Sequence, residues 1–140
     1  MSRVLALDFG EARCGCAISD PTGTLATPLE AIERPDTRRG MQRIVQLVRE
    51  SGAETVVVGL PLSLSGEEGP QALLTREWAG RLAARLPGVP VELHDERLTT
   101  RQAERTGGRA DEDSRAAAHL LEAYLASAPG APAGGGGART

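Results

Sequence analysis

The sequence predicts an α/β fold: a five-stranded mixed sheet, with three antiparallel strands followed by parallel ones and with helices on both faces. The first third of the chain contains short apolar segments joined by tight links, which is typical of antiparallel strands. After them, strand-like and helix-like segments alternate, and this alternation indicates strands added in parallel. A chain of 140 residues suits a single domain. We therefore expect one domain over residues 1–127.

The antiparallel strands are predicted by apolar runs and by the turns between them. The first run ends in Asp8-Phe9-Gly10, a pattern that indicates a strand followed by a turn. A link of only residues 11–13 leads to the next apolar run and favours a hairpin. Pro28 in the third run favours the edge of the sheet, because proline donates no ladder hydrogen bond. The expected strands are residues 4–9, 14–19 and 25–33.

The second part of the chain predicts helices alternating with buried strands. Asp36 or Thr37 is placed to cap a helix that ends at Ser51-Gly52. The β-branched run Val56-Val57-Val58 is typical of a strand buried on both faces. Gly107-Gly108 separates the last two helices. The expected elements are a helix to residue 50, a strand over 54–60, a helix over 70–86, a strand over 89–94, and helices over 99–105 and 113–126.

Composition narrows the possible functions. The net charge of −3 and the single Phe, Trp and Tyr argue against a strongly basic surface or a base-stacking platform. Cys14 and Cys16 are too few for a disulfide framework and are interpreted as small buried hydrophobic residues. With His94 and His119 as the only histidines, a zinc site is not expected. No signal peptide or long apolar run is present, so we expect a cytoplasmic protein without membrane contact.

Residues 128–140 are rich in glycine, alanine and proline. Such a composition cannot bury enough apolar surface to offset the entropy of ordering the chain. We therefore expect a disordered tail after the domain.

Three carboxylates stand where the predicted sheet would bring them together. Asp8 is near the end of the first strand, Glu96 follows the last strand, and Asp113 opens the final helix. In open α/β sheets, ligands bind outside the carboxyl ends of the strands. Clustered carboxylates repel one another unless a cation joins them, and hard oxygen ligands suit Mg²⁺ or Mn²⁺. Two such ions can activate a water molecule and stabilise the leaving oxygen of a phosphodiester.

Each acid also has a purely structural interpretation. Asp113 has the residue type and position of a helix N-cap, and Asp8 of a residue that shapes a turn. Glu96 is within reach of Arg97 or Arg101 for a surface ion pair, and its neighbour Asp95 competes for the same role.

Arg97, Arg101 and Arg105 recur every fourth residue beside the acids. On a helix they would form a basic stripe suited to backbone phosphates. A solvated helix face is the alternative interpretation, and Glu104 weakens the positive field.

The ordered motifs of the chain resemble those of the YqgF (RuvX) family of small nucleases. These motifs are Leu7-Asp8-Phe9-Gly10 with Arg13, Gly15, Ala17 and Ser19-Asp20; Val57-Val58-Gly59-Leu60-Pro61-Leu62; Gly66 through Gly69-Pro70-Gln71; His94-Asp95-Glu96-Arg97-Leu98-Thr99-Thr100; and Asp113-Ser114 with Ala116-Ala117. The resemblance implies a ribonuclease-H-like fold and metal ligation by Asp8, Glu96 and Asp113. It favours Glu96 over Asp95.

The resemblance also implies an endonuclease that matures the 5′ end of pre-16S ribosomal RNA, while some members of the family are described as resolving branched DNA. Arg13, with Arg97, Arg101 and Arg105, is a candidate contact to the nucleic acid. The partners implied are structured RNA or branched DNA and pre-ribosomal particles. A monomer and a homodimer both remain open, since a symmetric four-way junction would favour two-fold symmetry.

The chain departs from the family pattern at several positions. Ala12 stands where a basic residue is common, and the turn before the last helix, residues 107–112, is short and acidic. These departures bear on substrate affinity and are consistent with a basic partner that supplies the charge.

Two other function classes make different demands on the chain. Nucleotide hydrolysis would need a second such domain to enclose the nucleotide. A non-catalytic binding module in ribosome assembly would bind its particle without needing Asp8 or Glu96.

Overall fold

The computed structural model describes residues 3–98 and 109–127 and contains one five-stranded sheet in the order β3-β2-β1-β4-β5. β1 pairs with β2 and β2 with β3 in antiparallel fashion, whereas β1–β4 and β4–β5 are parallel pairs. The predicted fold class, three antiparallel strands followed by parallel ones, is therefore confirmed. The strands are β1 (Arg3–Asp8), β2 (Arg13–Ser19), β3 (Ala26–Glu33), β4 (Ala53–Leu60) and β5 (Val91–Asp95).

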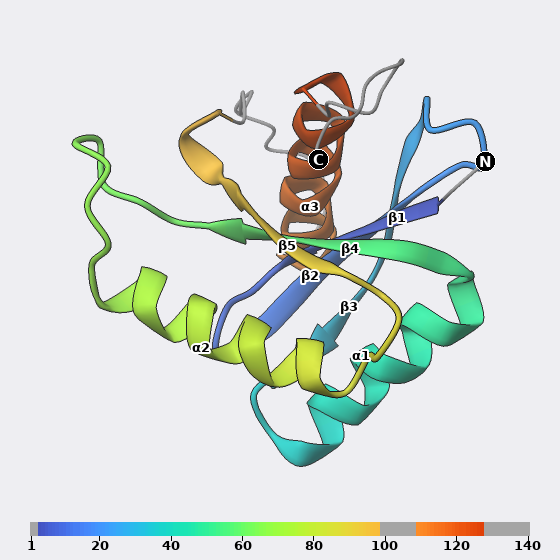
Figure 1. Ribbon diagram of the computed structural model, residues 1–140, viewed down its shortest axis with the longest axis horizontal. Helices are drawn as coiled ribbons and strands as arrows, with labels where there is room; N and C mark the ends of the chain where they lie inside the picture. The colour runs from blue at the N-terminus through green and yellow to red at the C-terminus, as the bar shows by residue number, and fades with distance from the viewer. Residues whose placement is uncertain (1–2, 99–108, 128–140) are drawn as a thin grey trace.

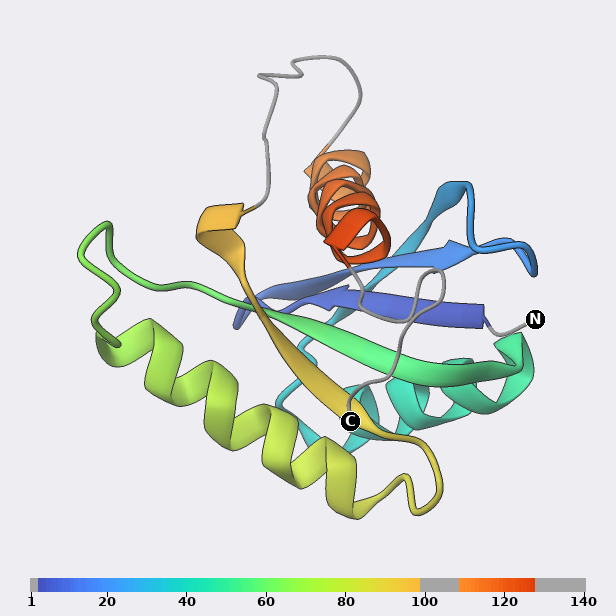
Figure 2. The same cartoon turned by 45° about the horizontal axis from the view of Figure 1, so that its top comes forward.

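Helices cover both faces of the sheet, as Figures 1 and 2 show. α3 (Arg109–Ser127) lies across one face, and α1 (Arg38–Ser51) and α2 (Pro70–Ala84) lie on the other. The buried apolar residues accordingly form two clusters, a larger one under α1 and α2 and a smaller one under α3. Leu5 and Leu7 of β1 belong to the first cluster, and Val4 and Ala6 to the second.

The helix ends follow the signals in the sequence. The Thr37 side chain accepts a hydrogen bond from the Gly40 backbone N–H at 3.1 Å and so caps α1. Gly52 ends the helix with φ 74°, a left-handed conformation that glycine adopts without steric cost. Both features agree with the predicted limits of this helix.

Trp78 fixes α2 against the sheet. Its fully buried ring stacks on Phe9 with 4.6 Å between the centroids, and its indole N–H donates to the Pro35 carbonyl oxygen at 3.0 Å. Phe9 directly follows β1, so this contact holds the helix layer against the end of the strand that carries Asp8.

The structure corrects one element. The final helix begins at Arg109, so Asp113 lies in its second turn and neither opens the helix nor caps it. Glu112 stands in the first turn of α3, where negative charge is favoured by the helix dipole. The predicted helix over 99–105 and the predicted tail over 128–140 lie outside the described residues. None of the helices within 3–98 and 109–127 has the length and apolar character that a membrane span requires.

Candidate active site

Asp8 lies at the carboxyl end of β1, on the face of the sheet that α3 covers. Side chains alternate between the two faces along a strand, and Val4 and Ala6 of the same strand pack in the cluster under α3. Asp8 continues this alternation and is half-buried. β1 is flanked by β2 on one side and by β4 on the other, so two neighbouring strands border the carboxylate.

Glycine on β2 brings Asp113 close to this position. Gly15 is the register partner of Asp8 across the β1–β2 pair. A Cβ atom on Gly15 would lie 1.9 Å from the carbonyl oxygen of Asp113, so only glycine permits this approach of α3 to the sheet. The second turn of α3 therefore rests directly on the strand next to Asp8.

Ser114 anchors the same turn of the helix inside the sheet. The β2–β3 register is interrupted between the pairs Cys14–Ile32 and Cys16–Leu29. The backbone N–H of Cys16 donates to the Ser114 hydroxyl oxygen at 3.4 Å, and that hydroxyl donates to the Leu29 carbonyl oxygen. The hydroxyl thus bridges the two strands at the interruption and fixes the height and rotation of α3, and with them the position of Asp113.

A second glycine accommodates Glu96 on the other side of Asp8. Gly59 follows Val58, which is the register partner of Leu7 on β1. A Cβ atom on Gly59 would lie 2.6 Å from Oε2 of Glu96, so the Glu96 side chain lies over the backbone of β4 at this point. Val57 packs under α3, and Gly59 shares its face, so Glu96 is on the same side of the sheet as Asp8.

We expect Gly59→Ala to separate activity from stability. The added methyl group must displace the Glu96 carboxylate, and a displacement of about 1 Å in a catalytic group can cost about 100-fold in rate. Alanine is otherwise favoured over glycine within a strand by about 0.5–1 kcal/mol. Cleavage should therefore fall by at least about 10-fold, while the melting temperature is unchanged or higher. Gly80→Ala on α2, where no atom lies within 4 Å of the added Cβ, is the matched control. Full cleavage activity in the Gly59 variant would contradict a role for Glu96.

Asp113 is held by Arg13. The Arg13 Nε donates to Oδ2 of Asp113 at 2.8 Å, and both side chains are about one-third exposed. Within the described part of the chain, no three His, Cys, Asp or Glu side chains are close enough together to hold a metal ion. The three acids share one edge and one face of the sheet, and their carboxylate oxygens suit a hard divalent cation. In the arrangement that the structure describes, Asp113 is paired with Arg13, and the three acids do not form a closed metal site.

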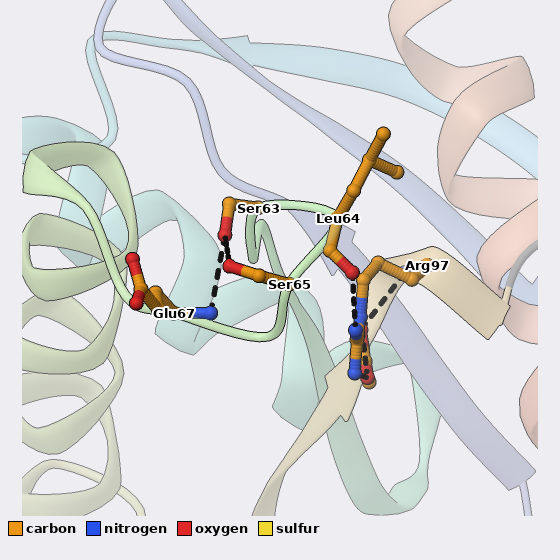
Figure 3. A network of polar contacts seen from close by, with 6 residues as sticks. Ser63, Leu64, Ser65, Glu67 and Arg97 are labelled. Atoms are coloured by element: carbon orange, nitrogen blue, oxygen red, sulfur yellow. Dashed lines mark hydrogen bonds and ion pairs between the residues drawn. The ribbon is translucent and has the colours of Figure 1, made fainter.

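The guanidinium of Arg97 binds two other groups of the protein, a carboxylate and a backbone carbonyl. It donates to both carboxylate oxygens of Asp95, and its Nη1 donates to the Leu64 carbonyl oxygen at 3.1 Å (Figure 3). The hydrogen bonds from Arg97 lower the pKa of Asp95, so this pair stays ionised. Asp95, the competing candidate, is therefore engaged by Arg97. Arg101 and Arg105 lie outside the described residues.

The two cysteines are small buried residues, as the sequence indicates. Cys14 and Cys16 are fully buried and reduced, and burial raises the pKa of the Cys14 thiol, which keeps it neutral. His94 packs edge-on against the ring of Tyr124, and burial lowers its pKa.

Comparisons with known proteins decide the family. The model of the RuvX family, described as Holliday junction resolvase, matches residues 2–127. The chain belongs to the RuvX family. A relative from Nocardioides sp. is 50% identical over 134 residues, covering 86% of this chain and 85% of the relative. A relative from Chloroflexus aurantiacus is 44% identical over 131 residues, covering 87% and 85%. Both carry the name "Putative pre-16S rRNA nuclease", so this RuvX chain belongs to a family of nucleases.

Solved structures confirm the fold. The Thermus thermophilus RuvC structure superposes on this RuvX chain with a TM-score of 0.58, at 17% identity, covering 89% of this chain and 95% of RuvC. RuvC of the same organism in complex with a Holliday junction substrate gives a TM-score of 0.56, also at 17% identity. The fold is thus the ribonuclease-H-like fold that the sequence predicts.

In the sequence, the residues Gly15, Gly59 and Ser114 stand out only because they belong to the family motifs. Nothing in their residue types indicates that two glycines and one serine set the distances between the acids. Those roles depend on contacts across 37 to 99 positions of the chain, from Gly59 to Glu96 and from Gly15 to Ser114.

Proposed function

We propose that this protein is a metal-dependent endonuclease that hydrolyses phosphodiester bonds, with pre-16S ribosomal RNA near its 5′ end as substrate. One observation carries the proposal. Asp8 lies between two strands whose glycines admit Asp113 on one side and Glu96 on the other, at the carboxyl edge of the sheet. The names of the relatives that match over most of the chain support the choice of RNA.

Asp8, Glu96 and Asp113 would hold Mg²⁺ or Mn²⁺. Bound ions of this type supply activation of the attacking water and stabilisation of the leaving oxygen in an in-line displacement. Glu96 is seated over Gly59, and Asp113 is set by the Ser114 hydroxyl, so both carboxylates are held by the fold rather than by flexible loops. Arg13 would neutralise Asp113 before the ions arrive and then face the substrate phosphates.

We expect Arg13→Gln to bind Mn²⁺ more tightly than the wild type. The substitution removes a positive charge that competes for Asp113, and such a charge at about 4 Å in solvent is worth about 1 kcal/mol. The dissociation constant, measured by calorimetry without nucleic acid, should fall about threefold to fivefold. Arg43→Gln, on the exposed side of α1, should leave it unchanged. Weaker Mn²⁺ binding in the Arg13 variant would show instead that Arg13 orients Asp113 for the ion.

Resolution of branched DNA is the second candidate, because the family model carries the description Holliday junction resolvase. The test compares a pre-16S RNA with its 5′ leader and a four-way DNA junction as substrates, in Mg²⁺, in Mn²⁺ and with a chelator. The proposal expects metal-dependent cleavage of the RNA at a defined position. Cleavage of the junction alone would select the second candidate. Absence of cleavage on both, with specific association to pre-ribosomal particles, would favour a non-catalytic binding module.

A further inference from the structure

Leu64 stands out among the apolar side chains. It lies in the loop of residues 61–69 between β4 and α2, and its exposed fraction is 94%. Among the residues whose side chains the structure describes, the other exposed leucines are Leu25, Leu73 and Leu74, with exposed fractions of 64%, 57% and 41%. At 94%, the Leu64 side chain contributes almost nothing to the folding of this chain through burial, so its apolar surface is available to a ligand.

The turn that carries Leu64 is held without help from the leucine side chain. The Gly66 N–H donates to the Ser63 carbonyl oxygen at 2.8 Å, and the Ser63 N–H donates to the Glu67 carbonyl oxygen at 3.0 Å. The Glu67 N–H also donates to the Ser63 hydroxyl oxygen at 3.1 Å (Figure 3). Gly66 has φ 92°, which a glycine provides without strain. The backbone is therefore fixed by polar bonds while the apolar side chain is left outside.

Arg97 ties this turn to the candidate active site. It donates to the Leu64 carbonyl oxygen at 3.1 Å, and its own orientation is set by Asp95. In Figure 3 the Leu64 side chain extends away from the carbonyl that Arg97 binds. Arg97 directly follows Glu96, so the arginine that binds the turn and the candidate metal ligand are consecutive residues. The position of the leucine tip is therefore coupled to the edge where we place cleavage.

We propose that Leu64 inserts between two adjacent bases of the nucleic-acid strand and holds that base step open beside the cleavage site. This inference depends on the proposed nuclease function. Leucine is among the apolar side chains that proteins use as wedges between base steps. The tip is one leucine flanked by Ser63 and Ser65, which suits the gap of a single opened step. The apolar core of a protein–protein interface needs a much larger contiguous area.

The test uses binding without cleavage. Asp8→Asn protein is mixed with a four-way DNA junction and, separately, with a pre-16S leader RNA, each carrying 2-aminopurine at single positions around its cleavage site. We expect the fluorescence of one 2-aminopurine position to rise on binding, because the base leaves the stack. With Leu64→Ser added, this rise should disappear and binding should weaken about tenfold. Leu64→Phe should retain the rise.

Leu25→Ser is the matched control, because Leu25 is an exposed leucine in the turn between β2 and β3, outside the site. It should keep both the fluorescence change and the affinity. If wild-type protein cleaves a substrate and Leu64→Ser alters neither fluorescence nor affinity, the wedge is overturned and the nuclease function stands. If wild-type protein neither binds nor cleaves either substrate, the proposed function fails, and the wedge with it.

Discussion

Asp8→Asn is expected to lower the rate of phosphodiester cleavage by at least about 1,000-fold. Asp8 is the acid at the centre of the proposed site, bordered by the strands that carry Gly15 and Gly59. Exchanging its carboxylate for an amide removes an ionised ligand, and charge stabilisation by a bound metal is worth several kcal/mol. Since about 1.4 kcal/mol corresponds to a factor of ten, the loss reaches about three orders of magnitude. Single-turnover cleavage of the preferred substrate in Mn²⁺ measures it.

The fold should survive this change. Asp8 is half-buried at a strand end, so we expect the free energy of unfolding to change by no more than about 1 kcal/mol. Asp36→Asn provides the control for loss of one negative charge, because Asp36 is exposed in the turn before α1. Cleavage by the Asp8 variant at the wild-type rate, in protein free of contaminating nuclease, would refute the assignment of the site.

Gly15→Ala should have the largest effect on stability. Its Cβ would lie 1.9 Å from the carbonyl oxygen and 2.4 Å from the carbonyl carbon of Asp113, both of which are backbone atoms that no rotamer change can move. α3 would have to leave the sheet locally and lose the bridge from Ser114 to β2 and β3. Overpacking of this kind costs about 3 kcal/mol or more when backbone must shift. Denaturant unfolding measures the loss.

Gly15→Ala should also lower metal affinity, because Asp113 moves with the helix. This separates it from Gly59→Ala, where the group that must yield is the end of the flexible Glu96 side chain. Gly80→Ala serves here as well to show the effect of one added methyl group in open space. A Gly15 variant with wild-type stability would mean that α3 does not pack as closely on β2 as the structure has it.

Much of the fold could be predicted from local signals. Thr37 and Gly52 mark the ends of the first helix by their capping chemistry. The β-branched run in β4 identifies a central strand, and the structure places it between β1 and β5. The order of strands follows from hairpins first and crossovers later. These features depend on residues near one another in the chain, which is why the sequence indicates them.

Contacts between distant residues could not be predicted in the same way. The acidic residues before Asp113 suit a first helical turn as well as a loop, so the sequence predicts a helix start at residue 113, four residues after the start at Arg109 in the structure. Arg13 and Arg97 were predicted to contact nucleic acid. The structure gives each an acidic partner within the protein, Asp113 and Asp95. Their contact with phosphates remains a prediction. It requires either that each arginine leaves its acidic partner or that its remaining N–H groups bind the phosphate.

The bridge made by the Ser114 hydroxyl determines at which stage of synthesis the proposed active site can be complete. Synthesis delivers all five strands before the final helix leaves the ribosome. Until that helix docks, the interruption between β2 and β3 has no hydroxyl to span it, and the third carboxylate is missing. A nascent chain without a docked α3 is therefore expected to be inert toward the RNA around it.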